Sequence, residues 1–412
     1  MTPTIPVDID ALLGLIQSAT HSAVAEYHKS GHGVPSPDGS WPHPLDSAPD
    51  ILALKHAIQL LEGACERLCT TLAQPAHTLL NRSMPFEAPC MRLVVEKKIP
   101  DLLEGFPEGL HIENIAAQTS LNTTKLRQVL RLLATRGCFK EVEDSIFANN
   151  RLSLTLLSSN PMSAIVATLA GENLRAVASL PEALVDPEYG ASVAPDKTSF
   201  TYTVRGEMKN ASFFDWYKTH RFDKAMIGWT FAAGEMSVVH NFPWATMPRG
   251  TTLCDVGSGV GTVSLAIAKA HPHISITLQD LPEPLGQAKV LWSDELPEAL
   301  DAERVQFIPV DFFQQAPVAG HNLYYMKHIL HDWPDSEAIK ILRNVTRYNS
   351  PFFEDELVLN HIYLGSSSND SSNTVGIAKA PAPLLPNYGT GNIRHYNQDI
   401  ASEVLLIGLS SY

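Results

Sequence analysis

TTLCDVGSGVGTVSLAIAKAHP, residues 251–272 of a 412-residue chain, combines the signals of a strand, a turn and a helix. Its apolar start predicts a buried β-strand, its glycines a tight turn, and its apolar end a helix. Gly257 and Gly259 permit positive φ angles and a close backbone approach, and Gly261 permits the helix to pack against the strand. This order is typical of nucleotide-binding α/β folds, which serve several chemistries.

Three further strands follow the glycine-rich turn. HISITLQD ends at Asp280, RVQFIPVD ends at Asp311, and NLYYM comes next. Asp280 lies nineteen residues after Gly261, and an acid at that strand tip can accept hydrogen bonds from both hydroxyls of a ribose. The spacing predicts a doubly wound α/β sheet with its ligand site at the carboxyl ends of the strands.

The pattern DxGxGxG over residues 255–261 distinguishes between cofactors. A dinucleotide enzyme would carry GxGxxG, whereas here an acid, Asp255, precedes the first glycine. Asp255 suits the ammonium group of an amino-acid-like ligand and would repel a pyrophosphate. We therefore expect S-adenosylmethionine and not NAD. A phosphate-binding loop is excluded because no Gly-Lys-Ser/Thr follows.

The charge balance disfavours nucleic acid and anionic membranes as partners. Thirty basic and 44 acidic residues give a net charge of −14, and an acidic chain lacks the field that attracts phosphate groups. No signal-peptide pattern and no apolar run of about 18 residues is present, so we expect a cytoplasmic protein. The five cysteines are expected to be reduced, with Cys65 and Cys69 in a helix core and no metal site.

The N-terminal half follows helical spacing. We expect helices over residues 8–29, from an Asp50 cap to about residue 71, and over 87–104. Residues 109–150 predict a helix, a turn, a second helix that Gly137 ends, and a two-stranded wing. This winged helix is a DNA-binding motif in other proteins.

Charge argues against DNA binding by this unit. Its second helix is basic, but its wing carries Glu141, Glu143 and Asp144, which would face phosphates with like charge. A dimerisation or substrate-lid module is the better interpretation. The aromatic-rich segment 213–235 is either helix core or one wall of an apolar substrate pocket.

From about residue 85 to 363 the chain resembles the class I S-adenosylmethionine-dependent O-methyltransferases of the caffeate and flavonoid type, especially their fungal secondary-metabolism branch. The matching pieces are FPWATMPRGTTLCDVGSGVG, QDLP, VDFF and YYMKHILHDWPDSEAIKILRNV. The resemblance implies a Rossmann-like doubly wound sheet preceded by an all-α winged-helix dimerisation domain. The expected domains are a helical extension over 1–84, the dimerisation domain over 85–247 and the cofactor domain over 248–412.

The resemblance also implies roles for single residues. His331, in the HDW triplet, would be the general base, Asp280 would bind ribose, and Asp311 would lie by the adenine. Lys327 would sit near the cofactor. His331 suits this role because a neutral imidazole can take the proton of a phenol as its oxygen attacks the sulfonium methyl. The neighbouring His328 is expected to be a packing residue.

The chain departs from the family pattern after its fourth strand. The family carries two acids that flank the catalytic histidine, and His361 takes the place of the first. No residues remain for the family's sixth and seventh strands, so the resemblance implies a domain that is incomplete at its C-terminus. Asp399 or Glu403 could replace the missing acids.

We expect a homodimeric O-methyltransferase that methylates a hydroxyl of an aromatic or polyketide-like small molecule. Two alternatives stay open. The protein could bind the cofactor and catalyse a rearrangement or cyclisation without consuming it, or it could be a non-catalytic dimer partner. A winged-helix transcription factor is a remote further possibility.

Overall fold

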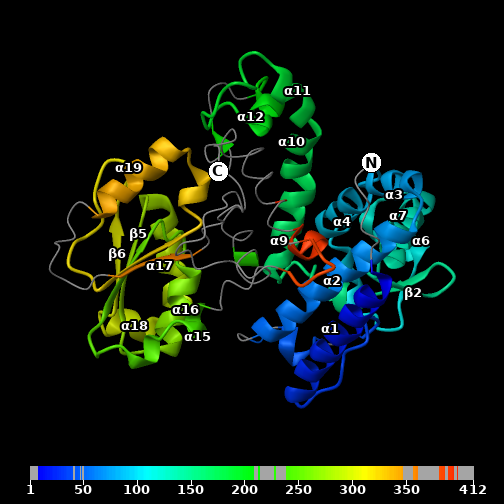
Figure 1. The fold of residues 1–412 in the computed structure, drawn as a ribbon, viewed down its shortest axis with the longest axis horizontal. Coiled ribbons are helices and arrows are strands. Elements are labelled where there is room, and N and C mark those ends of the chain that lie inside the picture. The colour runs from blue at the N-terminus through cyan, green and yellow to red at the C-terminus, as the bar shows by residue number, and fades with distance from the viewer. Residues whose placement is uncertain are drawn as a thin grey trace. The chain divides into compact units, whose positions relative to one another are not determined.

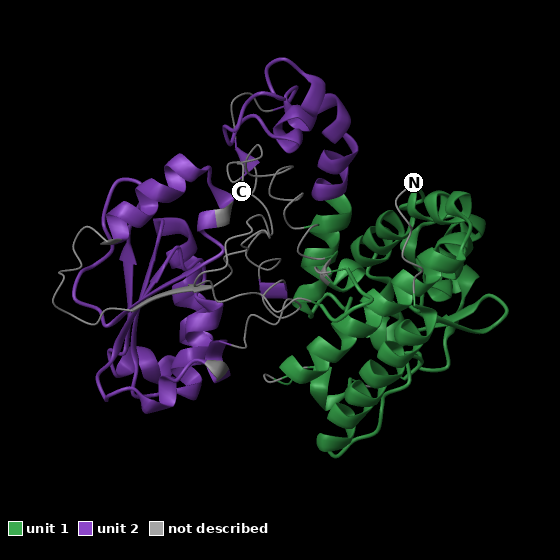
Figure 2. Cartoon of the chain, in the orientation of Figure 1, with its two compact units in different colours: residues 1–171, 368–399 green, residues 172–367, 400–412 purple. Residues whose placement is uncertain are grey.

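The computed structural model describes residues 8–39, 42–46, 48, 51–207, 212–213, 227–228, 238–346, 356–360, 380–385, 388–393 and 397. The chain divides into two compact units (Figure 2). The first joins residues 1–171 to 368–399, and the second joins residues 172–367 to 400–412. The domain boundaries expected at 84/85 and 247/248 stay a prediction.

Two long helices begin the first unit: α1 (Ile9–Lys29) and α2 (Leu52–Leu72). α1 begins after Asp8, whose side chain accepts a hydrogen bond of 2.9 Å from the Ala11 N–H and satisfies a free donor of the first turn. The helix predicted over 8–29 is confirmed. α2 has its N-cap at Ile51, and Asp50, the predicted cap, lies outside the described residues.

A segment from late in the sequence packs against α2. It forms the short helix η6 (Gly389–Asn392), which lies beside α2 in Figure 1. The approach is close because α2 presents a glycine there: a Cβ on Gly63 would come within 2.5 Å of the Tyr388 carbonyl oxygen. Leu384 of the same segment joins Ala64 in a small apolar core.

The single helix predicted over 87–104 is wrong. The structure has two helices, α4 (Glu87–Glu96) and α5 (Ile99–Glu104), after α3 (Pro75–Arg82). Pro100 explains the break, because it has no N–H to donate and its ring would clash with a carbonyl one turn earlier in a continuous helix. The chain turns at Lys98, which has a φ of 51°, and Pro100 falls in the first turn of α5.

The predicted helix, turn, helix and wing are confirmed. The elements are β1 (Leu110–His111), α6 (Ile112–Thr119), α7 (Thr123–Thr135), β2 (Lys140–Glu143) and β3 (Ile146–Ala148). The strands form an antiparallel sheet in the order β1-β3-β2. Asn122 caps α7 by accepting a hydrogen bond from the Lys125 N–H, and Gly137 follows the helix with a φ of 81°.

Short helices follow the winged helix in the sequence. They are α8 (Arg151–Leu154), α9 (Pro161–Thr168), the π-helix η2 (Leu169–Asn173), α10 (Leu174–Ala178), α11 (Leu180–Val185), α12 (Ser199–Val204), α15 (Val238–Asn241) and η4 (Trp244–Thr246). Most of the aromatic segment 213–235 lies outside the described residues. Its first residue, Phe213, is buried with its ring edge-on to Phe200.

Within the described ranges, no helix has both the length and the apolar character to cross a membrane.

A five-stranded parallel sheet forms the centre of the second unit. Its strands are β4 (Thr252–Val256), β5 (Ser275–Asp280), β6 (Val305–Pro309), β7 (Leu323–Lys327) and β8 (Glu356–Asn360). The strand order is β6-β5-β4-β7-β8, so the order reverses between β4 and β7. In this fold class, ligands bind at the carboxyl ends of the strands beside such a reversal.

Helices cover both faces of this sheet (Figure 1). One face carries α16 (Thr262–Ala270), α17 (Pro282–Glu295) and α18 (Pro297–Asp301), and the other carries α19 (Asp335–Thr346). Trp292 of α17 is fully buried on the first face, and Ile341 of α19 is fully buried on the second. The predicted doubly wound α/β sheet is confirmed.

Candidate functional site

The glycine-rich turn is fastened to the tip of β5. The N–H groups of Gly257 and Ser258 both donate to the Gln279 carbonyl oxygen, at 2.8 and 3.1 Å. The N–H of Gly261 donates back to the Ser258 carbonyl at 2.9 Å, which closes the turn. These bonds hold the turn at the carboxyl edge of the sheet, between β4 and the start of α16.

Glycine is required in this turn for two reasons. Gly257, Gly259 and Gly261 all have positive φ angles, of 73°, 55° and 72°, which side chains rarely adopt. A Cβ on Gly261 would also lie 2.7 Å from a methyl carbon of Leu278, so α16 could not pack as closely on β5. Gly259, in contrast, has open space where a side chain would stand, so its backbone is accessible to a ligand.

Asp280 lies at the tip of β5 and faces the turn. Its Oδ2 accepts a hydrogen bond of 2.7 Å from the Gly259 N–H, and its Oδ1 accepts one of 2.7 Å from the Leu281 N–H. These two bonds fix the orientation of the carboxylate at the strand tip, next to the glycine-rich turn.

Asp255 lies on β4, two residues before Gly257, and is more deeply buried than Asp280. Its side chain is 4% exposed, and its Oδ2 accepts a hydrogen bond of 2.6 Å from the Ser264 hydroxyl in the first turn of α16. Burial raises the pKa of Asp255 to about 6, with a smaller contribution from the Asp280 charge, while Ser264 and Lys327 act in the lowering direction. Asp255 therefore contributes a buried charge below the turn that titrates near neutral pH.

Asp311 follows β6 and lies close to Asp280 along the sheet edge. The Val310 N–H donates to the Asp280 carbonyl at 2.9 Å, which joins the two strand ends. The Asp311 side chain accepts from the Phe313 N–H at 2.9 Å, and this bond shapes the loop after β6. The Phe313 ring packs edge-on against Trp333, with centroids 4.6 Å apart, so an aromatic wall adjoins the acid.

The chain turns sharply after β7. Lys327 ends the strand, and His328 follows with a φ of 55° and a largely buried side chain. Burial agrees with the packing role predicted for His328. The backbone then forms η5 (Leu330–Asp332), with His331 at its centre.

His361, Asp399 and Glu403, the residues considered in place of the family's flanking acids, lie outside the described residues, and of His331 the structure describes only the backbone. The roles expected for these residues stay predictions. Ser264 and Gln279 are polar groups of this edge that the sequence analysis does not single out, because their partners depend on how α16 and β5 pack on β4.

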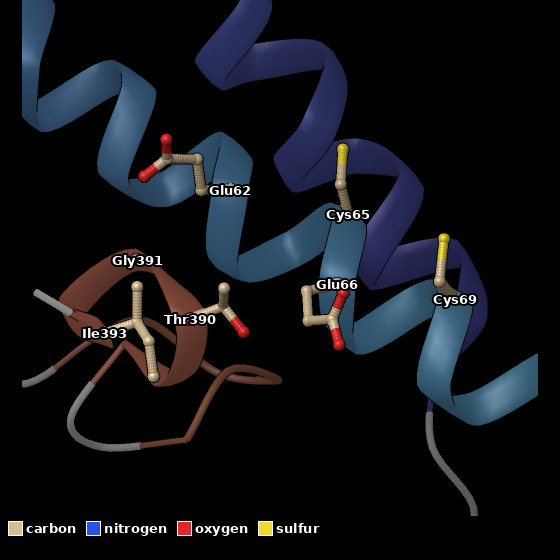
Figure 3. Close-up of a pocket in the computed structure, with 7 residues that line it drawn as sticks. All are labelled: Glu62, Cys65, Glu66, Cys69, Thr390, Gly391 and Ile393. Carbon is tan, nitrogen blue, oxygen red and sulfur yellow. The ribbon is translucent and has the colours of Figure 1, made fainter. Parts of the chain in front are cut away.

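The first unit contains a pocket of its own. It measures about 320 Å³ and lies between one face of α2 and the η6 segment (Figure 3); the α2 residues that line it are Glu62, Cys65, Glu66 and Cys69. The prediction that Cys65 and Cys69 are core residues is wrong, because both are exposed. α2 packs on α1 through other positions, such as Ala57 and Ala64. Among the described residues, no three His, Cys, Asp or Glu side chains are arranged to hold a metal ion.

The winged helix neutralises much of its own positive charge. Arg131 of α7 forms a two-pronged ion pair with Glu141 and a further pair with Asp144, both from the wing, with closest distances of 2.7 Å. Arg136 pairs with Glu87 at 2.9 Å. Two of the wing acids expected to repel phosphates therefore also occupy Arg131, and an acid of α4 occupies Arg136.

The family model and the curated relatives agree on one chemistry. A family model described as an O-methyltransferase domain matches residues 218–376. The chain is 38% identical over 414 residues to 3-O-methyltransferase 2 of Phanerochaete chrysosporium. The aligned region covers 98% of this chain and 90% of that protein.

Solved structures share the fold. The mitomycin 7-O-methyltransferase MmcR is 25% identical, with a TM-score of 0.57 over 84% of this chain and 89% of that one. LepI, solved in complex with SAM (S-adenosylmethionine), is 18% identical, with a TM-score of 0.63 over 85% of this chain and 84% of that one. At that identity, the likeness to LepI concerns the fold alone.

Proposed function

The chain belongs to the family of S-adenosylmethionine-dependent O-methyltransferases that act on small molecules, and we propose that its acceptor is a hydroxyl of an aromatic or polyketide-like compound of secondary metabolism. The observation that carries the proposal is the convergence of three elements at one sheet edge. The glycine-rich turn, the acid at the tip of β5 and the η5 segment that contains His331 all follow the carboxyl ends of neighbouring strands.

The residues at this edge fit the cofactor. The open space at Gly259 admits a ligand against the backbone, and the two oriented oxygens of Asp280 suit the two ribose hydroxyls. We assign Gly257 and Gly259 to backbone contacts and Asp311 to the adenine side, where the aromatic wall begins. Asp255 and Lys327 are assigned to the charged amino-acid end.

The chemistry requires one proton transfer and precise alignment. When bound, S-adenosylmethionine supplies a methyl group already activated by its sulfonium. A phenol has a pKa of about 10 and is neutral near pH 7, so a base must take its proton as the oxygen attacks. We assign this role to His331, since an imidazole is suited to accept a proton at neutral pH. The surrounding residues hold the acceptor in line and exclude water.

We further propose that the protein is a homodimer and works in the cytoplasm. Support for the dimer comes from α3, a helix with no buried residue. Leu79, Leu80 and Phe86, in or near it, are 64%, 62% and 61% exposed, and apolar clusters of this kind mark association surfaces. Support for the cytoplasm comes from the five cysteines, all of which are free. The ion pairs of Arg131 support the expectation that nucleic acid is not a partner.

The test is an assay with isotopically labelled S-adenosylmethionine and a panel of phenols and aromatic polyketides. The proposal predicts a labelled methyl ether and one S-adenosylhomocysteine for each product molecule. A changed product without S-adenosylhomocysteine would instead indicate a rearrangement or cyclisation. Activity of the isolated chain would exclude a non-catalytic partner role.

A further inference from the structure

Among the described residues, Ser264 is the one side chain shown to donate a hydrogen bond to the buried Asp255 carboxylate. Its hydroxyl is fully buried and donates to Asp255 Oδ2 at 2.6 Å. Ser264 belongs to the first turn of α16, which begins directly after Gly261. One hydrogen bond therefore links strand β4, which leads into the turn, with the helix that leads out of it.

Two neighbouring strands supply the charges that act on Asp255. Lys327 on β7 is opposite in charge, and Asp280 on β5 is like in charge. Cys254, the preceding residue of β4, is buried, and burial raises the pKa of its thiol above its usual range, so this group stays neutral near pH 7. Facing Asp255 from α16 is the neutral Ser264. The charge of Lys327 and one short hydrogen bond from Ser264 thus offset part of the cost of burying the carboxylate.

We propose that Ser264 is a positioning residue for the cofactor, which acts by keeping the Asp255 carboxylate ionised and directed at the glycine-rich turn. This inference rests on the cofactor role proposed for Asp255. A hydrogen bond to a carboxylate favours its ionised form, and an ionised Asp255 attracts the positively charged cofactor. Ser264 itself does not need to touch the ligand.

The inference makes a pH-dependent prediction for Ser264→Ala. Burial already raises the pKa of Asp255 to about 6, and loss of the hydrogen bond raises it further, so the variant loses the negative charge at a higher pH than the native protein. Affinity for S-adenosylmethionine should fall about tenfold near pH 6.5 and recover to within about twofold near pH 8.5, as expected for loss of one hydrogen bond to a charged group.

The experiment measures the dissociation constant of S-adenosylmethionine by calorimetry across this pH range, without acceptor. Ser293→Ala, which removes an exposed hydroxyl from α17, serves as control and should match the native protein. Asp255→Asn should bind more weakly with little pH dependence. A Ser264→Ala loss that is equal at all pH values, or no loss, would overturn the inference. Because no acceptor or turnover is involved, failure of the proposed His331 chemistry would leave this result unaffected.

Discussion

The backbone N–H of Gly259 donates a hydrogen bond of 2.7 Å to Oδ2 of Asp280. This bond joins the glycine-rich turn after β4 to the tip of the neighbouring strand. The Asp280 side chain thus shapes the turn, and the proposed function gives it a second task, which is to present acceptors to the ribose of the cofactor.

Substitution of Asp280 tests these tasks together. Asp280→Asn keeps one oxygen but loses the charge and one acceptor, and Asp280→Ala loses both. We expect affinity for S-adenosylmethionine to fall about tenfold in the first variant and about a hundredfold in the second, because hydrogen bonds to charged groups are the stronger ones. Equilibrium dialysis with labelled cofactor measures both values. Native affinity in Asp280→Ala would contradict the assignment.

Gly261→Ala should lower the stability of the second unit. The new Cβ would lie 2.7 Å from Leu278, and the residue would keep a φ of 72°. We expect the free energy of unfolding to fall by about 2 kcal/mol from strain and overpacking.

Gly286→Ala is the matched control, because this exposed glycine lies within α17 and a Cβ there meets nothing within 4 Å. It should gain about 0.5–1 kcal/mol from helix propensity. Urea unfolding compares the two variants. Equal effects would show that close packing at Gly261 does not matter.

The buried Asp255 carboxylate should lower the free energy of unfolding of the protein, although it is proposed to bind the cofactor. Its folded-state pKa is about 6, above the 3.8 of an unperturbed aspartate, so folding favours the protonated form. The resulting penalty is absent below the unfolded pKa, grows as pH rises through this window, and is complete above the folded pKa. Asp255→Asn should therefore be more stable than the native protein near pH 7.5, by on the order of 2 kcal/mol.

The measurement is urea unfolding of both proteins near pH 5 and pH 7.5. The stability gain should shrink at the lower pH, where the native carboxyl is already largely protonated. A gain that does not change with pH would show that Asp255 is not the titrating group.

The apolar side chains near α3 give a prediction for assembly. Leu79→Glu and Leu80→Glu place charges on the surface proposed for the dimer, so the doubly substituted protein should have the mass of one chain in light scattering. Val290→Glu, at a similarly exposed apolar position on α17, should leave the mass unchanged. A dimer that survives the first pair of substitutions would place the interface elsewhere.

The sequence predicted the second unit well because its signals are local. Glycines between a strand and a helix, and acids at strand ends, are signals that backbone geometry explains. A parallel sheet requires strands and helices to alternate along the chain, which is the order that these signals mark. The apolar spacing of 87–104 continues across Lys98, so it predicts one helix where the structure has two. Pro100 is the one local signal of the break. Cys65 and Cys69 were misplaced because periodicity does not show which face of a helix a partner covers. The bond from Ser264 to Asp255 depends on the packing of α16 on β4, which no local pattern specifies.

The most direct test of the account is a single-turnover measurement of methyl transfer by His331→Ala, beside its cofactor affinity. His240→Ala, at an exposed position on α15, is the control. We predict that transfer to a phenolic acceptor falls by about 10²–10⁴ in the His331 variant, as expected for loss of a general base, while the dissociation constant of S-adenosylmethionine stays within about twofold and the His240 variant behaves like the native protein. Transfer at the native rate in His331→Ala would contradict the account.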